Sequence, residues 1–239
     1  MVLTKDQIRQ KIWQLLTREK VARFPFPIRG RIPNFQGAEE AAHRLNELSL
    51  WQKARVIKCN PDSPQTSVRK KALLEGKKIY MAVPRLREEK CFVELDPKRL
   101  KSQDIAFAAT IKGAFKLGRQ VSLEEMEPID LIVAGSVAVS RDGARVGKGG
   151  GYSDLEYALA RTACLVDEST PIVTTVHSLQ ITEESWEMLV HDIPLDFIIT
   201  PDEIFETNHN YPKPEGIYWN ILKPEMLENI PVLRKRRET

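Results

Sequence analysis

The segment Arg145-Val-Gly-Lys-Gly-Gly-Gly-Tyr-Ser-Asp154 joins two stretches of different character and decides the predicted fold. Upstream, residues 129–139 are strongly apolar, as in a buried strand. Downstream, Leu155-Glu-Tyr-Ala-Leu-Ala-Arg161 is rich in helix-forming residues. The sequence therefore predicts a strand, a glycine loop and a helix in succession, which is a unit of an α/β fold.

The loop itself is suited to bind a polyphosphate. Its four glycines are Gly147, Gly149, Gly150 and Gly151. Because glycine has no Cβ, such a loop can turn several N–H groups toward one point, and a helix N-terminus behind it adds partial positive charge. Arg145 and Lys148 supply full positive charges, and Tyr152 and Ser153 complete the predicted contacts. We expect a nucleotide site here.

The loop matches neither of two familiar phosphate-binding patterns. A P-loop has Ser or Thr after its lysine, whereas Gly149 follows Lys148. The dinucleotide fingerprint has a glycine where Tyr152 stands. The alternative is a flexible glycine turn without a ligand, but the flanking charged and aromatic residues favour a ligand site.

Strand-like and helix-like stretches alternate along the rest of the chain, which indicates an α/β fold with a mainly parallel sheet and helices on both faces. Strands are expected at 55–59, 77–83, 91–95, 129–139, 171–176 and 196–199. Helices are expected at 4–19, 38–51, 66–75, 97–109, 153–164, 182–190 and 224–228. Residues 24–35 are predicted to be an irregular connector. Ser153 or Asp154 is the expected cap of the helix after the loop.

Composition and length indicate a globular protein with a substantial core. The chain has 239 residues, of which 42% are hydrophobic and 29% charged. We predict a main domain over residues 1–200 and a C-terminal extension over 201–239. No apolar run approaches the roughly 18 residues of a membrane helix, so no membrane association is expected. Three widely spaced cysteines and the absence of a signal peptide predict reduced thiols and a cytoplasmic location.

The positive charge gathers at the C-terminus. The net charge is +3, and Arg234-Lys-Arg-Arg237 supplies much of the excess. A solvated tail is the simpler interpretation, and a nucleic-acid contact is the alternative.

The motif Arg-x-Gly-x-Gly-x-Gly-Tyr-x-Asp over residues 145–154 resembles the signature of the 5-formyltetrahydrofolate cyclo-ligases. Lys5 and Arg9 on the first helix resemble the ATP-binding pair of that family, and residues 127–133, 171–180 and 195–200 resemble its strand segments. Residues 31–37, 135–140, 151–158 and 212–216 are more similar to a paralogous branch that includes the methenyltetrahydrofolate synthetase domain-containing proteins.

The resemblance implies a three-layer α/β/α fold of the NagB/RpiA/CoA-transferase kind. It also implies ATP- and Mg-dependent conversion of 5-formyltetrahydrofolate to 5,10-methenyltetrahydrofolate. Arg145 and Lys148 would serve catalysis, and both would hold phosphates together with Lys5 and Arg9. Asp154 and Asp192 are the expected Mg²⁺ ligands, since a nucleotide-bound Mg²⁺ needs one or two protein carboxylates. A helix cap for Asp154 and a turn residue for Asp192 are the alternatives.

The substrate side departs from the family pattern. Where cyclo-ligases carry a glutamate that binds the pterin of the folate, alignment places Ser63, which cannot accept two parallel N–H bonds. His177 and Gln180 follow a buried strand and are further candidates for substrate contact; a structural histidine is the alternative. Expected partners are therefore a nucleotide and a folate or another heterocycle. A paralog acting on a different ligand and a non-catalytic RNA-associated protein remain open, and the sequence does not predict the oligomeric state.

Overall fold

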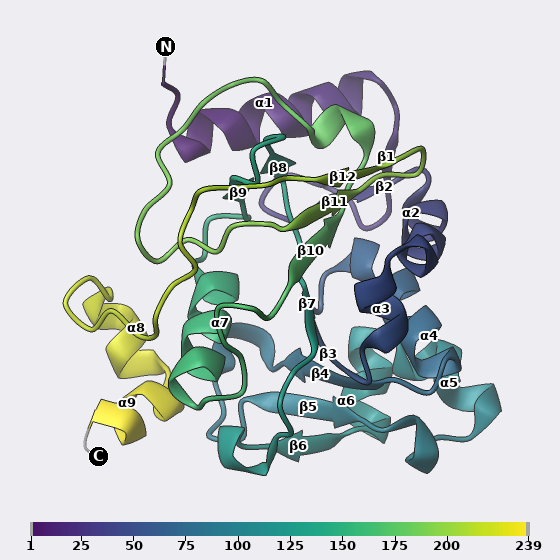
Figure 1. Cartoon of the computed structure of the whole chain (residues 1–239), viewed down its shortest axis with the longest axis vertical. Coiled ribbons are helices and arrows are strands. Elements are labelled where there is room, and N and C mark those ends of the chain that lie inside the picture. Colours follow the sequence, from purple (N-terminus) through teal and green to yellow (C-terminus); the bar gives the residue numbers. More distant parts are fainter. Residues whose placement is uncertain (1, 238–239) are drawn as a thin grey trace.

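The computed structural model describes residues 2–237 and is built around one mixed sheet (Figure 1). Its eight strands lie in the order β12-β11-β10-β7-β3-β4-β5-β6. The five central strands, β11 to β4 in that order, pair in parallel, while β12, β5 and β6 make antiparallel pairs at the two edges. The strands of this sheet are β3 (Val56–Cys59), β4 (Lys78–Ala82), β5 (Phe92–Leu95), β6 (Arg119–Val121), β7 (Leu131–Val133), β10 (Ile172–Thr175), β11 (Phe197–Ile199) and β12 (Ile204–Glu206).

Helices cover both faces of the sheet, so the predicted three-layer α/β/α fold with a mainly parallel sheet is confirmed (Figure 1). Successive strand residues point to opposite faces. In β3, Val56 packs in the core with helix α7 (Tyr152–Thr162), whereas Ile57 and Cys59 pack in the core beneath the other helices. Those other helices are α2 (Ala38–Arg44), α3 (Ser49–Lys53), α4 (Thr66–Leu74), α5 (Ile105–Ala108) and α6 (Ile111–Leu117).

A third apolar cluster attaches the N-terminal helix α1 (Lys5–Arg18) to the end of the sheet. Thr4 caps this helix in a capping box with Gln7. Its buried residues pack on the small hairpin of β8 (Ala138–Val139) and β9 (Arg145–Val146) and on Trp186. The predicted apolar strand over 129–139 is thus divided between β7 in the main sheet and β8 in the hairpin.

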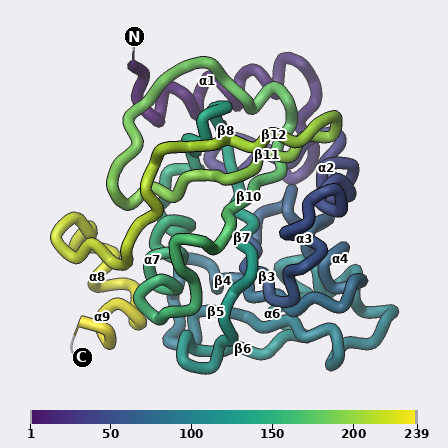
Figure 2. The backbone as a smooth tube through the Cα atoms, in the orientation of Figure 1, coloured from purple at the N-terminus to yellow at the C-terminus, as the bar shows by residue number. Residues whose placement is uncertain are grey.

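The helix predicted over 182–190 is wrong, because this segment makes its contacts with α1. Leu3 donates its backbone N–H to the carbonyl of Ser185, Lys11 pairs with Glu184 at 2.6 Å, and Trp186 is buried against α1. Tertiary contacts therefore replace the internal hydrogen bonds of a helix. The segment runs as an extended loop beside α1 (Figure 2).

Two further predicted helices are interrupted. The 38–51 stretch breaks at Leu48, whose backbone is extended. The 97–109 stretch contains short 3₁₀ turns around an extended Leu100 and becomes α-helical only in α5. Residues 24–35 form an irregular connector, as predicted, ending in the short pair β1 (Ala22–Arg23) and β2 (Asn34–Phe35).

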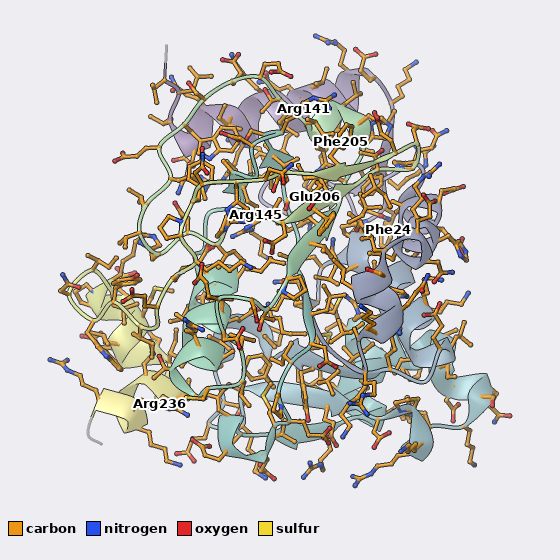
Figure 3. All side chains as sticks on the ribbon, viewed as in Figure 1. Phe24, Arg141, Arg145, Phe205, Glu206 and Arg236 are labelled. Carbon is orange, nitrogen blue, oxygen red and sulfur yellow. The ribbon has the colours of Figure 1, made fainter. Side chains whose placement is uncertain are left out.

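The C-terminal segment packs on α7 through α8 (Pro224–Asn229) and α9 (Pro231–Arg237) (Figures 1 and 2). Val232 and Leu233 are buried and anchor this helix. Arg234, Lys235 and Arg237 are exposed, as predicted for a solvated basic segment, and Arg236 pairs with Glu124 at 2.9 Å. Figure 3 shows Arg236 at the edge of the molecule, on α9. The division of the chain near residue 200 stays a prediction.

Candidate functional site

A large cavity lies at the carboxyl ends of β3, β4 and β7. From β3 the chain continues to β4 on one side, and from β7 it continues to β10 on the other. Ligands of open α/β sheets bind where the strand order reverses in this way. The cavity measures about 820 Å³, and residues 60–63, 83–85 and Gly135 line it beside the glycine loop, residues 147–151.

Two glycines of this loop have backbone conformations that side chains rarely adopt. Gly149 has a φ of +102° and Gly151 a φ of +69°. A Cβ on Gly149 would lie 3.3 Å from the guanidinium carbon of Arg9, so this residue is tight as well as strained. The glycines therefore let the loop run closely over the first helix.

Helix α7 begins directly behind the loop, with Gly151 at the N-cap position. No side chain accepts a cap hydrogen bond there, so the prediction that Ser153 or Asp154 caps the helix is wrong. Asp154 instead accepts from Arg145 at 2.6 Å and from the backbone N–H of Ile193 at 3.2 Å. The helix N-terminus thus faces the loop without a side-chain acceptor, which suits an anion.

Arg145 lies inside the molecule and organises the loop (Figure 3). It is 3% exposed and donates to the carbonyl of Gly135 at 3.0 Å as well as to Asp154. Its Nε has no hydrogen-bond partner within residues 2–237. Arg145 therefore connects the segment after β7 to the first turn of α7, and its Nε–H group remains without an acceptor in the described part of the chain.

The structure brings the other predicted cations to the same cavity. Lys148 pairs with Asp62 at 2.8 Å, and Lys5 pairs with Asp192. Arg9 donates to the carbonyl of Gly147 at 2.7 Å. These contacts fasten the loop and the first helix to the rest of the site.

Positive charge dominates the wall of the cavity. Seven lysines and arginines line it, against four aspartates and glutamates, an excess of three positive charges. The basic residues not yet named are Arg31, Arg85 and Lys223. This excess equals the net charge of the whole chain, +3, so the cavity concentrates the positive charge that a polyphosphate would neutralise.

Asp154 and Asp192 lie close together on the cavity wall, because Ile193, the neighbour of Asp192, donates its N–H to Asp154. Within residues 2–237 no group of three or more His, Cys, Asp or Glu forms a metal cage. Two carboxylates beside a phosphate site fit Mg²⁺ held mainly by a nucleotide, since that ion keeps waters and phosphate oxygens as its other ligands.

A polar cluster lies next to the loop; we refer to Lys58, Asn60, Ser153 and Glu156 as the Glu156 cluster. Asn60, Ser153 and Glu156 line the cavity, whereas Lys58 lies outside its lining. Lys58 and Glu156 form an ion pair, and they are 2% and 5% exposed. Asn60 accepts from Lys58 at 3.1 Å and donates to Glu156 at 3.4 Å. Burial raises the pKa of Glu156, and the charge of Lys58 opposes that shift.

The sequence did not lead to this cluster. Its members come from β3 and α7, about one hundred residues apart. One signal was present: Lys58 stands at the buried position of an apolar strand, on the same face as Val56. A charge at such a position requires a partner, which α7 provides.

The three residues predicted to contact substrate lie in different places. Ser63 lines the cavity. His177 and Gln180 do not belong to its lining and instead form a capping box, in which His177 Nδ1 accepts from the N–H of Leu179 at 3.1 Å. Phe35 packs edge-on against the His177 ring and covers this strand end. Burial lowers the pKa of His177.

The C-terminal segment adds a wall that sequence patterns did not reveal. The lining residues from this segment are Gly216, Ile217, Tyr218, Ile221, Leu222, Lys223 and Met226. Lys213 anchors the segment: it is buried and reaches Asp196 at 3.0 Å and the carbonyl of Thr170 at 2.9 Å. The cavity is therefore shared by the main sheet, the first helix and the end of the chain.

Fold and cavity together define an α/β protein with a cationic glycine loop at the strand-order reversal. The chain belongs to the 5-formyltetrahydrofolate cyclo-ligase family, whose family model matches residues 2–201. An NMR structure of the 5,10-methenyltetrahydrofolate synthetase of Aquifex aeolicus shares this fold, with a TM-score of 0.51, 21% identity and coverage of 87% of this chain and 95% of that one.

Relatives with higher identity carry a different name. The chain is 42% identical over 239 residues to the methenyltetrahydrofolate synthase domain-containing protein of Mus musculus, and 38% identical over 235 residues to that of Danio rerio. The matches cover 99% and 98% of this chain but 64% and 62% of those proteins. The resemblance to this branch is confirmed, and the chain spans less than two thirds of these relatives.

Proposed function

We propose that the protein is an ATP- and Mg²⁺-dependent cyclo-ligase that acts on a formylated, reduced folate. The observation that carries this proposal is the convergence of four cationic side chains, the glycine loop and two carboxylates on one cavity of about 820 Å³. The four side chains are Lys5, Arg9, Arg145 and Lys148. Family membership supports the reaction class.

In the proposed chemistry ATP transfers its γ-phosphoryl group to the formyl oxygen of the substrate and leaves as ADP. The neighbouring amine nitrogen, outside the pterin ring, then attacks the activated carbon and gives up its proton, which closes the new ring and expels the former formyl oxygen as inorganic phosphate. Protein residues supply position and charge rather than a nucleophile. Lys148 and the loop N–H groups would hold the transferred phosphoryl group, while Lys5 and Arg9 would hold the remaining phosphates from α1.

The ion pairs of the site suggest how Mg²⁺ contributes. Asp154 and Asp192 each pair with a cation, Arg145 and Lys5 respectively. If phosphate oxygens replaced the two carboxylates as partners of Arg145 and Lys5, both carboxylates would be available to bind Mg²⁺. The bound ion would neutralise negative charge on the phosphates. ATP should therefore bind more weakly when EDTA removes Mg²⁺.

Calorimetric titration of the purified protein with MgATP and with 5-formyltetrahydrofolate tests the proposal, together with a spectroscopic assay for the methenyl product. We expect both ligands to bind and the product to form only when both are present. Lys148→Ala should weaken MgATP binding roughly 10- to 100-fold, since a hydrogen bond to a charged group contributes about 1.5–3 kcal/mol. Lys116→Ala, remote from the cavity, is the matched control.

The outcomes separate the alternatives. If MgATP fails to bind, or if Lys148→Ala leaves its affinity unchanged, the nucleotide site is wrong. If MgATP binds but 5-formyltetrahydrofolate does not, the second candidate function gains support: a paralog that keeps the phosphate site and acts on another heterocycle. The position of Ser63 on the cavity wall favours this second function, because a serine cannot replace a carboxylate there.

A cytoplasmic location stays a prediction; among residues 2–237 no helix has the length and apolar character to cross a bilayer.

A further inference from the structure

The buried ion pair of Lys58 and Glu156 is more than the packing of α7 on β3 requires. Removing two charges from water costs several kcal/mol, and apolar residues of similar size often serve stability equally well. The two residues beside this ion pair in the cluster are polar as well. Asn60 directly follows β3, and Ser153 lies one helical turn before Glu156. Asn60, Ser153 and Glu156 line the cavity together, beside the apolar lining residues Leu155, Ala158 and Met226.

The two oxygens of the Glu156 carboxylate are used unequally. Oε2 accepts from Lys58 and, at 3.4 Å, from the amide of Asn60. Oε1 makes no hydrogen bond to any residue between 2 and 237, and Glu156 is part of the cavity lining. Glu156, paired with Lys58 through Oε2, therefore keeps a second carboxylate oxygen without a partner among the described residues, in a side chain that belongs to the cavity lining.

The chemistry of this acceptor selects its ligand. A carboxylate repels phosphate and accepts N–H groups, and its strongest neutral partners are edges that present a ring N–H beside an exocyclic amino group. Ser153 and Asn60 add a hydroxyl and an amide for the neighbouring polar atoms of such a ring. The phosphate loop ends at Gly151, two residues before Ser153, so a ring here would lie next to the bound phosphates.

We propose that Glu156, held by Lys58 and Asn60, is the specificity-determining residue that binds the 2-amino edge of the substrate heterocycle. This assignment deepens the proposed function and rests on it for the identity of the substrate. It gives the cavity a carboxylate in place of the one that Ser63 lacks. Ser63 and Asn60 belong to the same turn after β3, so both positions face one ring-binding region.

The test uses titration of the full chain with three probes: MgATP, pterin, and the same pteridine ring without its 2-amino group. We expect the wild-type protein to bind pterin at least about tenfold more tightly than the ring without the amino group, as for a charge-assisted pair. Glu156→Gln should abolish this preference and leave the affinity for MgATP within about threefold, because the loop contacts remain.

Two further variants keep the test decisive. Lys58→Met combined with Glu156→Gln removes the pair without leaving a buried charge, and it should lose the preference in the same way. Glu94→Gln is the matched control, since Glu94 is 5% exposed and bonded to Arg119 and Tyr80 but lies outside the cavity lining. It should bind every probe as the wild type does.

Each outcome decides one proposal. If Glu156→Gln retains the preference for pterin, or if the wild-type protein does not distinguish the two rings, the assignment of Glu156 is overturned. If MgATP does not bind but the amino-dependent preference exists and requires Glu156, the assignment stands and the cyclo-ligase proposal fails.

Discussion

The glycine loop and the Glu156 cluster lie at the same cavity but are built in opposite ways. The loop offers backbone N–H groups and a lysine whose side chain is 42% exposed, and its shape depends on two glycines with positive φ. The Glu156 cluster offers side chains alone, and its ion pair is almost completely buried. One region depends on local backbone conformation and the other on tertiary packing.

This contrast predicts different responses to substitution. Changes in the loop should act on ligand affinity and little on folding, because its charges are screened by solvent and its ion pairs contribute at most about 1 kcal/mol. Changes in the Glu156 cluster should act on folding first, because a charge left alone in the interior is strongly unfavourable.

The largest effect is expected for Glu156→Leu, which leaves Lys58 buried without its partner. The free energy of unfolding should fall by about 3–5 kcal/mol, as measured by urea denaturation. Adding Lys58→Met should recover most of this loss, since two apolar side chains of similar volume then pack together. A double variant as unstable as the single one would show that the pair is not energetically coupled.

A smaller effect is expected from Gly149→Ala and its matched control, Gly76→Ala. Both glycines have positive φ, +102° and +78°, so each substitution should cost about 1 kcal/mol of unfolding free energy. Only Gly149 lies against Arg9, while Gly76 is outside the cavity lining and nothing is within 4 Å of a Cβ on it. MgATP affinity should therefore fall only for Gly149→Ala. Equal affinities for the two variants would contradict the role of the loop.

The smallest effect on the free energy of unfolding is expected for His177, which follows β10 and packs against Phe35. Because burial lowers the pKa of His177 below its ordinary value of 6.5, the unfolded chain binds the proton more readily. His177 therefore contributes stability that is complete above pH 6.5 and is lost as the pH falls through the lowered pKa of the folded state. His177→Asn keeps an acceptor for Leu179 but does not titrate. Urea midpoints between pH 7 and pH 5 should decline less steeply in this variant, and parallel declines would contradict the prediction.

Sequence reasoning succeeded where the determining features are local. The alternation of strands and helices and the strand–loop–helix unit around Gly147–Gly151 depend on neighbouring residues. It failed at 182–190, where Trp186 packs on α1 instead of supporting a helix. It also missed the partnership of Lys58 and Glu156, because no local pattern records that β3 and α7 meet.

Sequence reasoning identified the cationic residues of the candidate site but not the partner that each one has in the structure. Arg145 lines the cavity as expected, and the structure adds that it is bonded to Asp154 and to the carbonyl of Gly135; its contact with phosphate stays a prediction. His177 was expected near a ligand because it follows a strand, but it lies outside the cavity lining and packs edge-on against Phe35. Which strand ends stay open is determined by the segments that cross them.

The wall formed by residues 216–226 has a consequence for how this branch of the family can be engineered. The family match ends at residue 201, yet Tyr218, Lys223 and Met226 face the ligand cavity. A chimera that joins residues 2–201 to a foreign C-terminus would keep the glycine loop but have a different wall on this side of the cavity. Exchange of the segment after residue 201 between relatives would thus change the shape of the cavity without changing the loop.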